Sequence, residues 1–291
     1  MERELWKILY RLAKACDNPL RWWMATYYRD FEIVAVYFWA VVHDRPTCWV
    51  CDPKNWPKGL RRFALPSQST MSRRLWTTEV QHLMHNMEGF LMRFEGHGWV
   101  KVVDGKPLIV GTHSKDCDCE WGRAGRNYGK GYKLHAVFGN GPMPWQWEIT
   151  PLNVGEPEVA ARLIPALPQG GYLLGDKQYD SNPLHDIALG TGYQLVAERK
   201  RPGTELGHRR HSPGRLRSIE LLRNDFGKDL YQCRDDVERR FGWLTNHGGG
   251  LAPLPNWVRR IHRVRCWVQA KLIIHALCVY LYHGPPMLAV A

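Results

Sequence analysis

Acidic residues are scarce in this chain of 291 residues: 28 Asp and Glu stand against 40 Lys and Arg, and none follows Glu238. The formal net charge of +12 favours a polyanionic partner, nucleic acid before an anionic membrane. Hydrophobic residues make up 44% of the chain and aromatic residues 12%, which indicates a globular protein and excludes a disordered one.

Long apolar runs are missing as well. The two most apolar stretches, residues 33–42 and 272–282, are shorter than the roughly 18 residues that a membrane-spanning helix needs, so we predict buried helices at both. The first residues, MERELWK, are charged and lack the apolar core and cleavage site of a signal peptide. No internal repeat or low-complexity tract is present. We therefore expect no membrane partner.

The eight cysteines do not indicate a disulfide framework, because no secretion signal accompanies them and reduced thiols are then the norm. Cys48 and Cys51 have zinc-like spacing. Cys117 and Cys119 offer a poor second half of such a site, since structural zinc sites usually pair two CxxC or CxxH elements. Free thiols are the favoured interpretation, with zinc binding as the alternative.

The N-terminal part, residues 1–96, is predicted to be mainly helical, since apolar residues recur with a 3.6-residue period near its start. Residues 67–75 predict a second helix, capped by Ser67 or Ser69. Short polar residues followed by paired arginines suit a reader of the DNA major groove, and an ordinary capped surface helix is the alternative. The candidate DNA-binding residues of this helix-turn-helix-like segment are Ser69, Thr70, Arg73 and Arg74.

A different pattern begins near residue 97. Alternating apolar residues and turn signals predict strands at 99–111, 132–139, 144–150, 171–176 and 193–199. Helical periodicity at 156–167 and 181–190, and a late helix that carries Glu238, complete the order. This order predicts an α/β domain, a mixed sheet flanked by helices, over residues 97–291 with a basic C-terminal helix.

Two aspartates follow apolar strand segments of this sheet. Asp104 comes after Val-Lys-Val-Val and before Gly-Lys-Pro, and Asp176 ends the predicted strand 171–176. Ligands bind at the carboxyl ends of strands in open α/β sheets, and two converging carboxylates suit Mg²⁺ or Mn²⁺. The alternative is that each aspartate is a simple turn residue.

The stretch RDDVERRFGWLTN, residues 234–246, gathers the last acidic residues of the chain. An apolar stripe of the predicted helix comprises Val237, Phe241 and Leu244. Helical spacing places Tyr231, Arg234, Glu238 and position 245 on one face. Glu238 borders the apolar stripe, where it can reach the two aspartates. A charged amphipathic helix without a ligand is the alternative.

Together these segments resemble a known family. VDGKPL, YKLHAV, LLGDKQYDSN and the Tyr-x2-Arg-x3-Glu pattern are similar to the catalytic core of bacterial insertion-sequence transposases of the DDE type, in the branch with a Tyr-Arg-Glu-Lys signature. The resemblance covers about residues 96–250, and LPSQSTMSRRL resembles a DNA-binding segment of related transposases. It implies a ribonuclease-H-like fold. It also implies that Asp104, Asp176 and Glu238 are the catalytic carboxylates and hold Mg²⁺ or Mn²⁺, with two ions expected.

The same resemblance implies that Tyr231 and Arg234 contact the transposon end. The chain departs from the signature at Thr245, where the family has lysine, and Arg239 and Arg240 are the candidates to supply the missing charge. Residues 199–217 add a basic loop with seven Lys and Arg against one Glu, including Arg199, Lys200 and Arg201. Exposed, this loop would bind DNA phosphates, and a solvated basic surface is the alternative.

The function implied is metal-dependent cleavage of DNA at transposon ends followed by strand transfer into target DNA. The implied partners are double-stranded DNA and a second copy of the chain in the synaptic complex. The implied setting is the nucleoid in a bacterial cytoplasm. The alternatives are a metal-dependent nuclease of the same fold without strand transfer, and a catalytically silent DNA-binding relative.

Overall fold

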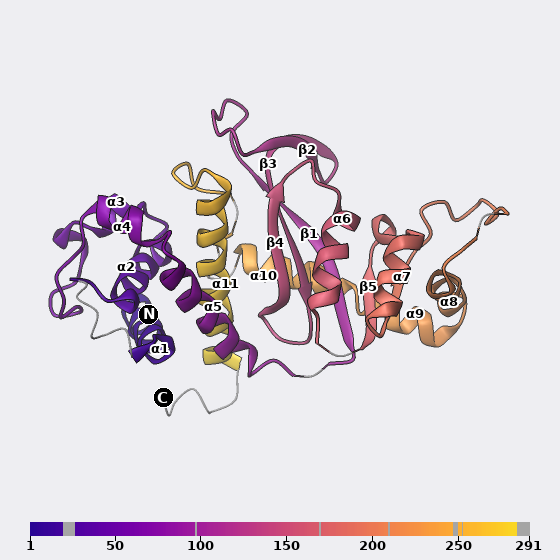
Figure 1. The fold of residues 1–291 in the computed structure, drawn as a ribbon, viewed down its shortest axis with the longest axis horizontal. Coiled ribbons are helices and arrows are strands. Elements are labelled where there is room, and N and C mark those ends of the chain that lie inside the picture. Colours follow the sequence, from indigo (N-terminus) through magenta and orange to yellow (C-terminus); the bar gives the residue numbers. More distant parts are fainter. Residues whose placement is uncertain are drawn as a thin grey trace. The chain divides into compact units, whose positions relative to one another are not determined.

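The computed structural model describes residues 1–19, 27–96, 98–168, 170–208, 210–246, 250–251 and 253–283 (Figure 1). The chain forms two compact units. The first comprises Met1–Phe94, Pro255–Val258 and Cys266–Ala291, and the second comprises Glu95–Leu254 and Arg259–Arg265. The expected division at residues 96 and 97 thus differs from these units in the C-terminal helix, most of which belongs with the N-terminal region.

The first unit is built around one apolar helix. Its elements are α1 (Glu2–Cys16), α2 (Asp30–Val42), α3 (Thr47–Val50), α4 (Gln68–Arg74), α5 (Thr78–Met92) and the part of α11 (Ile261–His283) that begins at Cys266. Nearly every residue of α2 is buried, as predicted for residues 33–42. The indole N–H of Trp6 donates to the carbonyl of Ala35 at 2.8 Å, which fixes α1 against α2.

Contacts of α11 explain why its larger part belongs to the first unit. Gln269 donates to Glu88 of α5 at 2.9 Å, and the buried Lys271 pairs with Asp44 at 2.6 Å. By length and composition, Ile261–Tyr282 meets the criteria for a membrane span, with a mean hydropathy of 1.4. Because 67% of that window is buried inside the structure, and core helices meet the same criteria, this is weak evidence for a membrane.

The second unit contains a six-stranded mixed sheet. Its strands are β1 (Val100–Ile109), β2 (Glu120–Ala124), β3 (Asn127–Phe138), β4 (Pro144–Pro151), β5 (Gly171–Gly175) and β6 (Tyr193–Ala197). The strand order is β2-β3-β1-β5-β6, and β4 pairs with the second half of β3. The pairs of β3 are antiparallel, whereas β1–β5 and β5–β6 are parallel.

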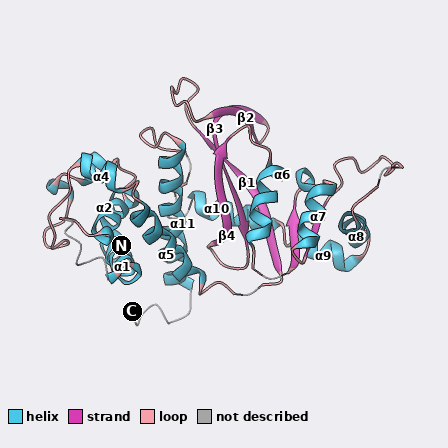
Figure 2. Cartoon of the chain, in the orientation of Figure 1, coloured by secondary structure: helices cyan, strands magenta, loops and turns pink. Residues whose placement is uncertain are grey.

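Helices cover both faces of this sheet (Figure 2). They are α6 (Glu156–Leu163), α7 (Asn182–Gly190), α8 (Pro213–Leu221), α9 (Asp225–Gln232) and α10 (Asp235–Asn246). Val137 of β3 belongs to a core cluster with α6 and α7. Its neighbour Phe138 meets Phe241 of α10 with ring centroids 5.3 Å apart. Since successive strand residues point to opposite faces, α6 and α10 lie on opposite sides. This is the predicted ribonuclease-H-like fold, and the predicted fold class is confirmed.

The strand predicted at 99–111 is confirmed as β1, which runs through Gly105-Lys106-Pro107 to Ile109 although these residues carry a turn signal. Pro107 is tolerated because the pairing of β1 with β5 ends at Val102, so its missing N–H lies on a side without a partner strand. The hairpin formed by β2 and the first half of β3 was not foreseen, and the basic loop at 199–217 gives way to α8 at Pro213.

Candidate active site

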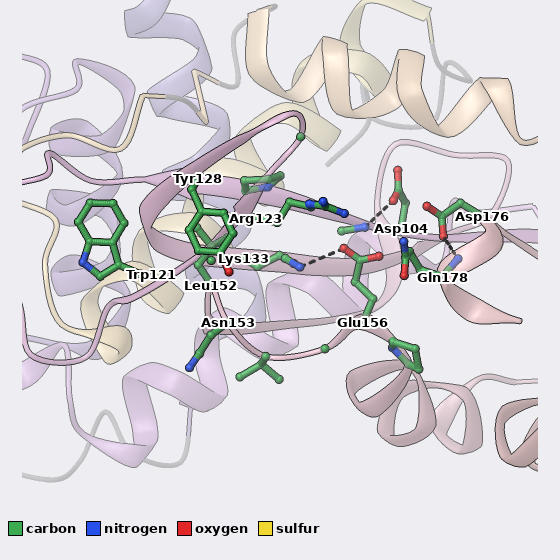
Figure 3. Close-up of a pocket in the computed structure, with 17 residues that line it drawn as sticks. Asp104, Trp121, Arg123, Tyr128, Lys133, Leu152, Asn153, Glu156, Asp176 and Gln178 are labelled. Atoms are coloured by element: carbon green, nitrogen blue, oxygen red, sulfur yellow. Dashed lines mark hydrogen bonds and ion pairs between the residues drawn. The ribbon is translucent and has the colours of Figure 1, made fainter. Parts of the chain in front are cut away.

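Asp104 and Asp176 are brought to the same edge of the sheet by the parallel pairing of β1 with β5. Val102 pairs with Leu174, and each aspartate lies two residues further along its strand direction. Asp104 is inside β1, while Asp176 follows β5 and accepts a hydrogen bond from the N–H of Gln178 at 2.7 Å. Both carboxylates line one cavity of about 600 Å³ in the second unit (Figure 3).

Asp104 carries a negative charge that its surroundings do not neutralise. Burial, with the nearby carboxylates of Glu156 and Asp176, raises the pKa of this carboxyl to about 7. The N–H of Gly105, which donates to Oδ1 at 2.7 Å, and the guanidinium of Arg234 oppose this shift only in part. A carboxyl with a raised pKa in a cavity with other carboxylates is a typical functional group, and it favours a bound cation.

Glu156, the first residue of α6, is a further acidic residue of the same cavity. Its Oε1 accepts from Nζ of Lys133 on β3 at 3.0 Å, and both side chains are largely buried. A Cβ at Gly105 would lie 3.0 Å from the same oxygen, so Glu156 packs directly over the backbone beside Asp104. Sequence reasoning missed this residue. Its signal was an acidic first turn on the helix after the antiparallel strands.

Tyr179 supplies a neutral hydroxyl at the same place. Its side chain is fully buried, and its hydroxyl has no hydrogen-bond partner among the described residues. Burial raises the pKa of Tyr179 well above its usual value, and the charges of Glu156, Asp104 and Asp176 add to this effect. The hydroxyl therefore stays protonated beside a group of carboxylates.

Glu238 lies on α10 with 66% of its side chain exposed and is bonded to Arg234 at 3.5 Å. Arg234 is also close enough to Asp104 to lower the pKa of that carboxyl. Across the part of the chain that the structure describes, no group of three or more His, Cys, Asp or Glu is arranged to hold a metal ion. Carboxylates without a cation repel one another, so an arginine between Glu238 and Asp104 is the arrangement expected of a metal-free site. The metal-binding role of Glu238 stays a prediction.

Tyr231 and Arg234 lie together, as their spacing predicts. The hydroxyl of Tyr231 donates to the carbonyl of Gly175 at 3.1 Å, directly before Asp176. Burial raises the pKa of Tyr231 to about 12. The Arg234 guanidinium lies 5.8 Å from the centre of the Tyr231 ring. Tyr231 thus ties the junction of α9 and α10 to the end of β5, and its contact with DNA stays a prediction.

Several side chains that were predicted to contact DNA form hydrogen bonds within the protein. Arg240 donates to the carbonyls of Asn140 and Gly141, whereas Arg239 is exposed. Arg199 donates to the carbonyls of Pro202 and Thr204, so it closes its own turn. The side chains of Lys200 and Arg201 are exposed. Of this set, Arg239, Lys200 and Arg201 have exposed side chains, and their contacts with DNA stay predictions.

In the first unit, α4 is a capped helix, since Ser67 accepts a hydrogen bond from the N–H of Thr70 at 3.2 Å. Ser69 also bonds to the Ser67 hydroxyl at 2.9 Å. Arg74 pairs with the buried Asp30 at 2.5 Å and donates to the carbonyl of Tyr28, so its role is structural here. Arg73 is exposed. The DNA-reading roles of Ser69, Thr70 and Arg73 stay predictions.

The cysteines of the zinc alternative are free thiols. Cys48 is exposed and Cys51 half-buried, and burial raises the pKa of the Cys51 thiol to about 11. A thiol with a raised pKa is a poorer metal ligand, because metals bind the thiolate. This observation favours the free-thiol interpretation for Cys51.

The sheet order, with aspartates emerging at one edge from β1 and β5, is the architecture of a transposase core. Residues 95–277 match the family model described as the transposase DDE domain, and the chain belongs to this family. Membership implies an enzyme that acts on DNA. No curated protein and no solved structure matches the chain.

Proposed function

We propose that the protein cleaves DNA at the ends of a transposon and transfers the cut strand to target DNA, in a reaction that depends on Mg²⁺ or Mn²⁺. The observation that carries this proposal is the position of Asp104, inside β1, beside Asp176, at the end of the neighbouring β5, with the pKa of Asp104 raised to about 7 by burial and nearby carboxylates. The alternative of simple turn residues does not account for this accumulation of charge.

The donor set fits hard divalent cations, since it consists of carboxylate oxygens with a neutral tyrosine hydroxyl nearby. Asp104 and Asp176 would hold the ions, joined by Glu238 once it separates from Arg234. Glu156 would add a further oxygen to the same group. When bound, such ions activate water or a 3′-hydroxyl and stabilise the leaving oxygen of a phosphodiester.

The chain's own residues would hold the DNA around this centre. Arg234 is placed to meet a phosphate when it releases Glu238, and the adjacent Tyr231 fixes its position through Gly175. This cluster supports the Tyr-Arg-Glu-Lys branch, with Thr245 as its departure. The proposed ligand is double-stranded DNA at the bacterial nucleoid, with a homodimer that brings two ends together.

The decisive experiment measures Mg²⁺- or Mn²⁺-dependent nicking of DNA that carries the element's own ends. Wild type is compared with Glu238→Gln and with Glu220→Gln, an exposed acidic residue of α8. We expect the first variant to bind these ends but not to cut them, and the second to behave as wild type. Joined products with a target plasmid distinguish a transposase from a nuclease. Binding by wild type without cutting under either ion would favour the silent relative.

A further inference from the structure

The β2–β3 hairpin presents side chains to the Asp104 cavity that the proposed chemistry does not use. Residues directly opposite one another in an antiparallel pair point to the same face. Trp121 pairs with Lys130, and Arg123 pairs with Tyr128. These four side chains therefore share one face of the hairpin, which we call the hairpin face.

At the centre of the opposite side, the pair is Gly122 with Gly129, both buried. A Cβ at Gly122 would lie 2.6 Å from the carbonyl oxygen of Leu152. A Cβ at Gly129 would lie 3.0 Å from Cδ1 of Ile109. The two glycines thus let the middle of the hairpin pack closely on Leu152 and Ile109, which leaves the hairpin face turned away from this contact.

The hairpin face combines exposed aromatic rings with positive charge. Trp121 is 48% exposed and Tyr128 is 74% exposed. Arg123, opposite Tyr128, is exposed, while Lys130 is anchored by a 2.8 Å bond to the carbonyl of Ser114. Both aromatic residues line the same cavity as Asp104 and Asp176, at its opposite end (Figure 3). Two exposed aromatic rings beside an arginine are the usual composition of a platform for nucleic-acid bases.

Asp104 and the hairpin face are separated along β3. Asp104 pairs with Ala136 of β3, and Trp121 pairs with Lys130 of the same strand. At about 3.4 Å per residue, the six residues between these partners span about 20 Å along β3. At about 3.4 Å per nucleotide, this is the contour of about six stacked nucleotides. A strand with its reacting phosphate near Asp104 would therefore reach the hairpin face about six nucleotides away.

We propose that the hairpin face binds unpaired bases of the DNA substrate, with Trp121 and Tyr128 stacked on bases and Arg123 on the strand's phosphates. The proposal rests on the proposed function for the identity of the ligand. Unpaired DNA is the favoured occupant because the faces of bases inside a duplex are covered by their neighbours, so an aromatic ring gains stacking area only on an unstacked base. The net charge of +12 favours a polyanion over an apolar protein partner.

The test measures equilibrium binding by fluorescence anisotropy of two labelled DNAs, with the full chain in EDTA so that no cleavage occurs. One DNA carries the element's end with six unpaired nucleotides beside the cleavage position, and the other is the same sequence fully paired. The variants are Trp121→Ala, Tyr128→Ala, Arg123→Ala and the conservative Trp121→Phe. The matched control is Trp99→Ala, a 77% exposed tryptophan that does not line the cavity. Thermal unfolding confirms that each variant is folded.

We expect Trp121→Ala and Tyr128→Ala each to weaken binding of the partly unpaired DNA roughly tenfold and to change duplex binding less than twofold. Trp121→Phe should retain most of the affinity, and Trp99→Ala should equal wild type. Arg123→Ala should weaken both DNAs and reduce the salt dependence of log K by about 0.7 to 0.9. Folded alanine variants that bind the partly unpaired DNA like wild type, or that lose both DNAs equally, would overturn the proposal.

Failure of this proposal is distinguishable from failure of the proposed function. If wild type cuts DNA ends while Trp121→Ala and Tyr128→Ala bind normally, the hairpin proposal fails alone. If these variants lose the partly unpaired DNA while wild type cuts under neither ion, the hairpin proposal stands and the catalytic one fails.

Discussion

Asp104 and Asp180 are buried to different degrees in the same unit and have opposite electrostatic surroundings. Asp180 is 4% exposed and is held by Arg215, whose Nε and Nη2 lie 2.6 and 2.8 Å from its two oxygens. The N–H of Lys200 and the ring of His185 complete this shell. Burial alone would raise the pKa of Asp180, but these partners hold it well below its usual range. Around Asp104, burial and two carboxylates raise the pKa to about 7.

This difference separates a structural carboxylate from a functional one. The bonds of Asp180 tie the start of α7, the loop at residue 200 and α8 together, so its charge stabilises the fold. The Asp104 carboxylate accepts a hydrogen bond from the backbone N–H of Gly105 and is only partly offset by the charge of Arg234. Its negative charge therefore destabilises the metal-free fold and favours binding of a cation. Substitutions at the two positions should therefore act in opposite directions on stability.

The largest expected effect is on activity. Asp104→Asn should reduce divalent-ion-dependent nicking by roughly 10³-fold or more, because it removes a charged ligand of the reacting centre. Rates are measured under single-turnover conditions, with DNA binding in EDTA as the control for folding. Nicking within tenfold of wild type would contradict the assignment of Asp104 to the centre.

The second effect concerns stability and compares the two aspartates directly. Asp180→Asn should lower the free energy of unfolding by roughly 3–5 kcal/mol, because it leaves the Arg215 guanidinium without its partner charge. Asp104→Asn should raise the free energy of unfolding at pH 8 in EDTA. Urea unfolding of both variants measures this difference. Two shifts of the same sign would remove the distinction between the sites.

The contributions of Asp104 and Asp180 to the free energy of unfolding should also depend on pH in opposite directions. Since the pKa of Asp104 is about 7 when folded against 3.8 as its ordinary value, its contribution is fully present below pH 4 and is lost as pH rises through 7. The loss is up to about 4 kcal/mol, less for partial exposure to solvent. Asp180, with its lowered pKa, contributes stability above pH 4 that is lost as pH falls. Urea unfolding in EDTA from pH 4 to 8 should therefore show a decline that Asp104→Asn flattens, and an unchanged decline in that variant would contradict the assignment.

A smaller effect tests whether Glu156 belongs to the same metal site as Asp104. Glu156→Gln should weaken the binding of Mn²⁺ to the DNA-free protein roughly tenfold, measured by calorimetry. Glu148→Gln is the matched control, because Glu148 is bonded to Arg162 at 2.8 Å and does not line the cavity. If Glu156→Gln and wild type bind Mn²⁺ with equal affinity, Glu156 does not contribute to the metal site and serves only as the ion-pair partner of Lys133.

Sequence reasoning identified Asp104 and Asp176 because strand periodicity and the position of a strand's end are local signals. It did not identify the role of Asp180, because that role depends on tertiary partners. Arg215, which neutralises Asp180, is 35 residues away in sequence. Glu156 was missed for the same reason: only the fold brings the first turn of α6 over Gly105. The strand β1 was predicted in spite of Pro107, which a strand tolerates where it lacks a neighbour on one side.

The smallest expected effect comes from adding a positive charge beside Glu238, near the site of Asp104, whose negative charge is not neutralised. Thr245 follows Glu238 by seven residues on α10, and its hydroxyl donates to the carbonyl of Phe241 at 2.6 Å. Thr245→Lys supplies the lysine of the proposed Tyr-Arg-Glu-Lys signature and should strengthen binding of transposon-end DNA a few fold, with the salt dependence of log K increasing by about 0.9. Gln232→Lys, at an exposed position of α9, adds the same charge elsewhere. An equal gain in both variants would show that net charge, and not its position beside Glu238, determines the affinity.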